Sequence, residues 1–214
     1  MVADPSNKRH ASKVLRRLRR DYPDADCALL FDSPFQLLIA TILSAQCTDV
    51  RVNIVTQGLF AKHPTATSMA KIPLPRLEKM IKSTGFFRNK AKNIKACCEA
   101  LVQHHGGEVP VDMDALVQLA GVGRKTANVV LGTAHGLATG VVVDTHVGRI
   151  SRRLGLTKQL DPVRAESELM QCLPKNEWVR YSHRVIHHGR QVCKARKPLC
   201  DDCGMADICP RIGV

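Results

Sequence analysis

The chain has 214 residues, with 32 Lys or Arg against 19 Asp or Glu, which gives a formal net charge of +13 and a pI near 9.6. With 44% hydrophobic and 24% charged residues, the composition is that of a globular protein rather than a disordered one. The longest apolar run, LLIATILSA, is far shorter than the roughly 20 residues that span a bilayer, and the N-terminus lacks the apolar core of a secretion signal. These features argue against a membrane-spanning or secreted protein, and the basic excess favours a polyanionic partner such as nucleic acid.

The spacing of apolar residues is helical along almost the whole chain and predicts an all-α fold of nine or ten short helices. Ser33-Pro34-Phe35-Gln36 combines an N-cap, a proline in the first turn and a capping-box glutamine ahead of LLIATIL. Asp112 is expected to cap MDALVQL, and Asp161-Pro162 opens VRAESELMQCL in the same way. The loop from Gly136 to Gly140 is the best candidate for a domain boundary.

The middle of the chain carries the stretch LAGVGRKTANVVL. A nucleotide P-loop would need glycine where Arg124 stands, and the dinucleotide fingerprint fails because Thr126 occupies its third glycine position. What remains is a helix, a tight turn and a second helix. Gly121 and Gly123 permit positive φ or close approach, and amides at the start of a helix form a phosphate site that does not depend on base sequence. The stretch therefore predicts either a hairpin that binds a nucleic-acid backbone or a plain structural turn.

Lys125 follows this turn directly, and two roles are open to it. A lysine in the first turn after a phosphate-binding loop is most often a counter-ion. The positive end of a helix also disfavours an ammonium group, and a nucleophilic lysine needs its free amine. The residues alone do not choose between counter-ion and nucleophile.

Asp144 follows three valines and precedes HVGRISRRL, so we expect it to cap the N-terminus of a helix. A carboxylate at this position also suits a role beside a developing cation. Arg149, Arg152 and Arg153 then predict either a basic face for DNA or ordinary solvated surface charge.

Four of the nine cysteines crowd the C-terminal segment with the spacing C-x6-C-x2-C-x5-C, at Cys193, Cys200, Cys203 and Cys209. Four thiolates on one short segment predict a metal site, although zinc and an iron–sulfur cluster both accept such a ligand set. The first gap holds the cations Lys194, Arg196 and Lys197, which a metal-pinned loop would present to phosphate. The other five cysteines lie in apolar contexts and are predicted to be free thiols in a reducing compartment.

Taken in order, LAGVGRKTANVVL, VVVDTHVGRISRRLGL and the four cysteines resemble the endonuclease III family, the bifunctional DNA glycosylases of the helix-hairpin-helix superfamily. SPFQLLIATILSAQCTDVRVN, IKSTGFFRNKAKNI and HHGRQVCKARKPLC extend the likeness over nearly the whole chain. The resemblance implies two helical lobes with a DNA-binding cleft between them. One is a central, barrel-like lobe over residues 27–138 with the hairpin at about 113–134. The other joins residues 1–26 to 139–214 and carries a [4Fe–4S] cluster in 193–209.

By the same resemblance Lys125 is the catalytic nucleophile, Asp144 is the catalytic carboxylate, and the four C-terminal cysteines hold the cluster. Residues at the positions of Gln46, Phe86 and His146 approach or fill the gap left by an extruded nucleotide. The residues expected to contact DNA are Gln46, Phe86, Gly121, Val122, Gly123, Arg124, His146, Lys194, Arg196 and Lys197.

The implied activity is base excision repair. An oxidised pyrimidine is removed from duplex DNA, and the strand is then nicked 3′ to the abasic site by β-elimination through a lysine Schiff base. The expected partner is double-stranded DNA with damaged pyrimidines or abasic sites, bound by a monomer in a bacterial cytoplasm at the nucleoid, without membrane contact. Two alternatives are a monofunctional adenine or mismatch glycosylase, which would lack lysine at position 125, and a non-catalytic helix-hairpin-helix DNA-binding protein, against which Lys125 and Asp144 argue.

Overall fold

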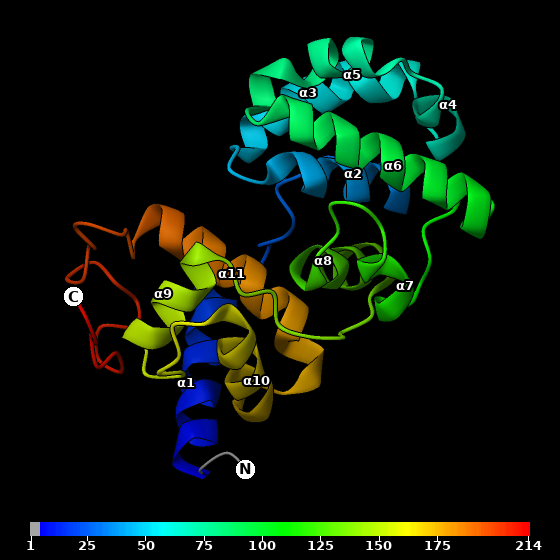
Figure 1. The fold of residues 1–214 in the computed structure, drawn as a ribbon. Helices are drawn as coiled ribbons and strands as arrows, with labels where there is room; N and C mark the ends of the chain where they lie inside the picture. The colour runs from blue at the N-terminus through cyan, green and yellow to red at the C-terminus, as the bar shows by residue number, and fades with distance from the viewer. Residues whose placement is uncertain (1–4) are drawn as a thin grey trace. The chain divides into compact units, whose positions relative to one another are not determined.

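The computed structural model describes residues 5–214, and within them the chain forms eleven α-helices, two short 3₁₀ helices and no β-strand (Figure 1). The all-α prediction is confirmed, with more helices than the nine or ten expected. None of the described helices is long and apolar enough to cross a membrane. The chain divides into two compact units. A continuous unit covers residues 27–137, and a discontinuous unit joins the N-terminal segment up to residue 26 with residues 138–214.

The continuous unit is organised around α6, its longest helix, which packs against α2, α4 and α5 (Figure 1). Its helices are α2 (Pro34–Ser44), α3 (Asp49–Lys62), α4 (Ala66–Ala70), α5 (Leu74–Ile81), η1 (Lys82–Thr84), α6 (Phe87–His105), α7 (Met113–Val117) and α8 (Arg124–His135). The apolar helix α2 has its side chains buried on most of its faces and packs against α3, α6 and α8. The core of this unit therefore lies around α2, and α7 and α8 pack against each other at its edge.

The expected helix starts are present, with one difference. The Ser33 hydroxyl accepts the N–H of Gln36 at 3.2 Å, as an N-cap should. The Gln36 side chain, however, accepts the N–H of Asp32 at 2.8 Å rather than that of Ser33, so the reciprocal capping-box bond falls one residue earlier. Asp112 and Asp161 cap α7 and α10, each accepting the backbone N–H three residues ahead, at 2.8 and 2.9 Å.

The discontinuous unit is built from helices that come from both ends of the chain: α1 (Pro5–Asp21), α9 (Thr145–Arg153), α10 (Pro162–Cys172), η2 (Lys175–Glu177) and α11 (Trp178–Gln191). α11 packs against both α1 and α9. α1 buries the stripe Ala11, Val14, Leu15 and Leu18, at the spacing of one helix face, and leaves most of its basic residues exposed. Residues 192–214 follow α11 without a helix or strand and close back on α9, where the Ile212 N–H donates to the Arg153 carbonyl at 3.2 Å (Figure 1).

Candidate functional site

The hairpin between α7 and α8 depends on one of its two glycines. Gly121 has φ +78, and a Cβ added there would lie 2.9 Å from the Cβ of Asn93 on α6. Both the backbone conformation and the close approach therefore require glycine. Gly123 uses neither freedom, since its φ is −92 and the space around it is open. A side chain at position 123 would occupy the open space beside the N-terminus of α8.

The anion-binding potential of the hairpin lies at the start of α8 rather than along the whole turn. The Val122 side chain is buried in the core, and its N–H donates to the Leu119 carbonyl at 3.1 Å. Val122 can thus offer DNA neither its side chain nor its amide. Gly123 is the N-cap residue of α8 and provides no side-chain cap, and a helix leaves its first amides outside its own hydrogen-bond ladder. This start is a place where a phosphate oxygen can bind.

Lys125 is the second residue of α8 and, like Arg124 before it, is exposed. The tight turn ends two residues earlier, so the amine projects from the same helix start that can bind a phosphate. This position suits either role expected for it, counter-ion or nucleophile.

Gln46 and Phe86 lie in the continuous unit, one after α2 and the other directly before α6. Both are exposed, Phe86 to 63%. Both also have left-handed backbone conformations, with φ of 53 and 47, and among the described non-glycine residues only Arg211 shares this property. A left-handed non-glycine residue costs about 1 kcal/mol or more and persists only where its surroundings hold it. The two residues expected to enter DNA are therefore strained as well as exposed.

In the discontinuous unit, Asp144 begins α9, as expected. Its Oδ1 accepts the Val147 N–H at 2.7 Å, which confirms the N-cap. Two residues after Asp144, in the first turn of α9, His146 is half-buried, and its Nδ1 lies 3.4 Å from Arg149 Nη2. A Cβ added at Gly189 of α11 would lie only 2.5 Å from the His146 Nδ1, so this glycine allows α11 to pack directly against the first turn of α9. Sequence reasoning missed Gly189, although a lone glycine within a helical pattern is a signal of close packing.

The four C-terminal cysteines line one pocket, together with Arg153 and His188. All four are free thiols. Hydrogen-bond donors point at three of their sulfurs: Arg153 Nη1 lies 3.3 Å from Cys193 Sγ, and backbone amides lie 3.4 Å from the sulfurs of Cys203 and Cys209. Such donors stabilise thiolates, the form that binds iron.

The four thiols that line this pocket fit an iron–sulfur cluster, which binds four thiolates, each through a different iron. Burial raises the pKa of the Cys203 and Cys209 thiols, so binding of iron there displaces protons.

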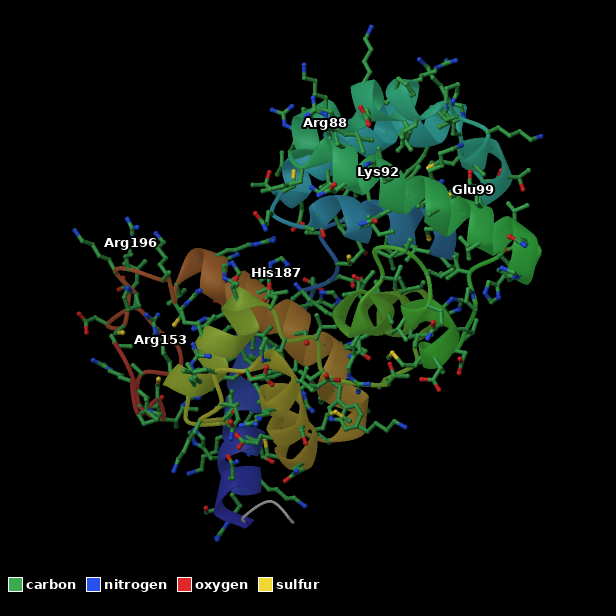
Figure 2. All side chains as sticks on the ribbon, in the orientation of Figure 1. Arg88, Lys92, Glu99, Arg153, His187 and Arg196 are labelled. Carbon is green, nitrogen blue, oxygen red and sulfur yellow. The ribbon has the colours of Figure 1, made fainter. Side chains whose placement is uncertain are left out.

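Arg153, expected on a basic or solvated face, is instead buried at the end of α9, at 6% exposure. Its guanidinium donates to the Lys194 carbonyl at 2.8 Å and the Ala195 carbonyl at 2.9 Å. Arg149 is half-buried and donates to the Cys193 carbonyl at 3.0 Å. Figure 2 shows Arg153 where α9 meets the C-terminal segment. The two arginines hold the cysteine loop against α9, because their long side chains donate to backbone carbonyls of that loop.

The same loop exposes the cations expected to contact phosphate. Lys194, Arg196 and Lys197 are all exposed, and Arg196 points away from the helices of its unit (Figure 2). Next to the loop, burial lowers the pKa of His188 to about 4, and the Tyr22 hydroxyl lies 3.0 Å from the His188 Nδ1. The imidazole of His188, which lines the cysteine pocket, is therefore neutral near pH 7, and sequence reasoning did not single out this histidine.

Comparison with known proteins agrees with this geometry. Residues 39–175 match the HhH-GPD superfamily of base excision DNA repair proteins, and residues 193–209 match the iron–sulfur binding domain of endonuclease III. Endonuclease III of Synechocystis sp. is 53% identical over 96% of this chain and 94% of its own length. Two solved structures are similar with TM-scores of 0.90: a non-covalent endonuclease III–DNA complex at 46% identity and a trapped endonuclease III–DNA covalent intermediate at 45%. Each covers 95% of this chain, which covers 95% and 96% of theirs. The chain therefore belongs to the endonuclease III family of the helix-hairpin-helix superfamily, and is a DNA glycosylase and AP lyase of base excision repair whose C-terminal cysteines hold a [4Fe–4S] cluster.

Proposed function

We propose that this enzyme acts as a monomer on double-stranded DNA, removes oxidised pyrimidines, and nicks the strand 3′ to the abasic site, in a bacterial cytoplasm at the nucleoid. The observation that carries the proposal is the exposed Lys125 in the first turn of α8, directly after a tight turn of helix-hairpin-helix type. A purely hydrolytic glycosylase activates water and needs no amine at this position. The lysine therefore supports the lyase as well as the glycosylase reaction.

The first step is the extrusion of the damaged nucleotide. Unstacking a base costs a few kcal/mol and is least costly for a damaged base, so selection of the lesion begins here. Gln46 and Phe86, exposed and held in left-handed conformations, are the residues we assign to the gap that the nucleotide leaves, with His146 beside it. The start of α8 and the exposed cations at 194, 196 and 197 bind the backbone phosphates, which fix position without reading sequence.

In the chemical step, the free amine of Lys125 attacks C1′ of the sugar. The new N–C bond forms as the glycosidic bond breaks, and the base leaves with the bonding electron pair and takes up a proton. Asp144 stabilises the positive charge that builds on the sugar, as carboxylates do in glycoside hydrolysis. This role requires the DNA-bound enzyme to present Lys125 and Asp144 to the same sugar.

Strand scission follows once the sugar ring opens: the C1′–O4′ bond breaks, O4′ takes up a proton, and C1′ forms a Schiff base with the nitrogen of Lys125. The iminium withdraws electrons and acidifies the C2′ proton. Loss of this proton forms a C2′–C3′ double bond and breaks the C3′–O bond, so the 3′ phosphate leaves. Water hydrolyses the Schiff base and frees Lys125. Arg149 and Arg153 hold the cysteine loop against α9, and Cys193, Cys200, Cys203 and Cys209 would bind the cluster, which would order the same loop for DNA binding.

Borohydride trapping tests the nucleophile. Wild-type protein incubated with a thymine glycol duplex and borohydride should form a covalent DNA–protein adduct, and Lys125→Gln should form none. Lys62→Gln, at an exposed lysine in the last turn of α3, serves as the matched control and should be trapped like wild type. An adduct with Lys125→Gln, or none with wild type, contradicts the assignment.

A panel of duplexes tests the substrate class. We expect faster base removal from duplexes with thymine glycol or another oxidised pyrimidine than from a T·G mismatch or from adenine opposite oxidised guanine. Preference for either of the latter two would instead favour a mismatch or adenine glycosylase. Sedimentation of the enzyme with and without the thymine glycol duplex tests the monomer.

A further inference from the structure

Lys90, in the first turn of α6, is a buried lysine for which the reaction above has no use. It is 5% exposed, whereas Arg88 and Lys92 on either side of it are exposed (Figure 2). Its ammonium donates to two main-chain carbonyls, those of Leu43 and Thr84, each at 2.8 Å. Burial lowers the pKa of Lys90. Lysine is almost never fully buried unless it is paired, so the position of these two carbonyls indicates what Lys90 does.

The two carbonyls belong to segments that are far apart in sequence. Leu43 lies in the last turn of α2, three residues before Gln46. Thr84 ends η1, two residues before Phe86. Carbonyls at the end of a helix lack partners within it, and a cation there is favourable. The Lys90 side chain thus satisfies the ends of both segments at once.

The backbone changes direction immediately after each of these contacts. Gln46 and Phe86 are two of the three described non-glycine residues with positive φ. Strained conformations of this kind persist only when the surrounding structure determines them, and both lie within three residues of a carbonyl that Lys90 binds. The Lys90 N–H also donates to the Phe86 carbonyl at 3.1 Å, which fixes the start of α6 against the same turn.

We propose that Lys90 is a positioning residue that ties the Gln46 turn to the Phe86 turn, so that both side chains enter the DNA as one rigid pair. The inference rests on the proposed function in that it takes Gln46 and Phe86 to be the gap-filling residues. Lys90 touches no DNA. It removes the need to order two exposed turns at the moment the duplex opens, and that ordering would otherwise oppose extrusion.

Lys90→Met is the decisive variant, because methionine keeps an unbranched apolar side chain and lacks the donors. Lys95→Met is its matched control. Lys95 lies on the same helix and likewise donates to two carbonyls, that of Ala70 at the end of α4 at 2.7 Å and that of Ile72 just after α4 at 3.2 Å. Both variants remove a lysine that binds two carbonyls, and only Lys90→Met removes it from the two turns.

The first measurement is amide hydrogen exchange of the free protein, with its cluster and without DNA. Lys90→Met should speed exchange in both 44–48 and 84–87, whereas Lys95→Met should speed it around 70–73 instead. Unchanged exchange in either 44–48 or 84–87 of Lys90→Met would overturn the inference. This reading is independent of any activity.

The second measurement compares two substrates under single turnover. On a thymine glycol duplex, Lys90→Met should remove the base at least about tenfold more slowly, because the variant loses both charge-assisted hydrogen bonds to the two turns. On a preformed abasic site in a single strand there is no gap to fill, so strand cleavage by Lys90→Met should match that of wild type. Equal loss on both substrates would mean a general structural role and sink the proposal. If wild type acts on neither substrate, the proposed function fails, and the exchange measurement still decides whether Lys90 ties the two turns.

Discussion

Asp144 caps α9 in the structure and is the catalytic carboxylate of the proposed function, and substitutions at this one position can separate the two roles. Its Oδ1 caps α9 by accepting the Val147 N–H at 2.7 Å. Loss of such a cap costs about 1 kcal/mol, which lowers Tm by about 2–4 °C in a chain of this size. Asparagine caps nearly as well as aspartate, so Asp144→Asn should keep most of that stability and Asp144→Ala should lose it. Both variants lack the carboxylate charge, and both should slow base removal about a hundredfold or more.

Thermal unfolding followed by circular dichroism, together with single-turnover base removal from a thymine glycol duplex, tests both roles. Asp161→Ala is the matched control, because Asp161 caps α10 with the same geometry at 2.9 Å. It should lower Tm as Asp144→Ala does and leave the rate unchanged. If Asp144→Asn is as unstable as Asp144→Ala, the hydrogen bond to Val147 is not the stabilising contact. If Asp144→Asn is as active as wild type, Asp144 is a cap and nothing more.

Three further predictions concern the hairpin, the cysteine loop and the half-buried carboxylate of Glu168. Gly121→Ala should destabilise the protein by about 1–2 kcal/mol in urea unfolding and weaken DNA binding, because the added Cβ at φ +78 meets Asn93. Gly123→Ala places its Cβ in open space and should lower the free energy of unfolding by less; equal losses for the two variants would contradict this account. Arg196→Gln should lower the slope of log Kobs against log salt concentration for DNA binding by up to about 0.9, and an unchanged slope would mean that Arg196 touches no phosphate. Burial of Glu168 opposes its ionisation, but hydrogen bonds from Thr157, Gln159 and the Lys158 N–H outweigh this effect and lower the pKa of the carboxyl group. The stability that the ionised carboxylate contributes is therefore present above the usual carboxyl pKa of about 4.5 and is lost as the pH falls through the lowered pKa. Glu168→Gln should show a smaller fall of Tm in acid than wild type, and an equal fall would refute this account.

Local signals predicted much of the fold, because helix starts depend on residues three or four apart. The Ser33, Asp112, Asp144 and Asp161 caps are all present. The expectation at Gln36 was wrong because its flexible side chain accepts the N–H of Asp32, one residue before the N-cap, instead of the N–H of Ser33. The cysteine spacing predicted a metal site, and the four thiols do line one pocket.

Long-range burial could not be predicted in the same way. Lysine and arginine count as surface residues in any sequence pattern, yet Lys90 and Arg153 are buried because of carbonyl acceptors that lie up to 47 positions away in the chain. The sequence treats Gly121 and Gly123 alike, but only Gly121 needs to be glycine, for a related reason. Only Gly121 faces Asn93, and that contact comes from a different helix. The catalytic roles of Lys125 and Asp144 stay predictions that the substitutions above can test.

The discontinuity of the unit formed by both chain ends has a consequence for biosynthesis. α1 leaves the ribosome about 170 residues before α11, against which it packs, an interval of about 10–30 s at ordinary rates of translation. During this interval the whole continuous unit can emerge and fold, while the stripe of Ala11, Val14, Leu15 and Leu18 waits without its partner. We expect the exposed arginines and lysines on the rest of α1 to favour solubility of the growing chain until its apolar stripe can pack against α11.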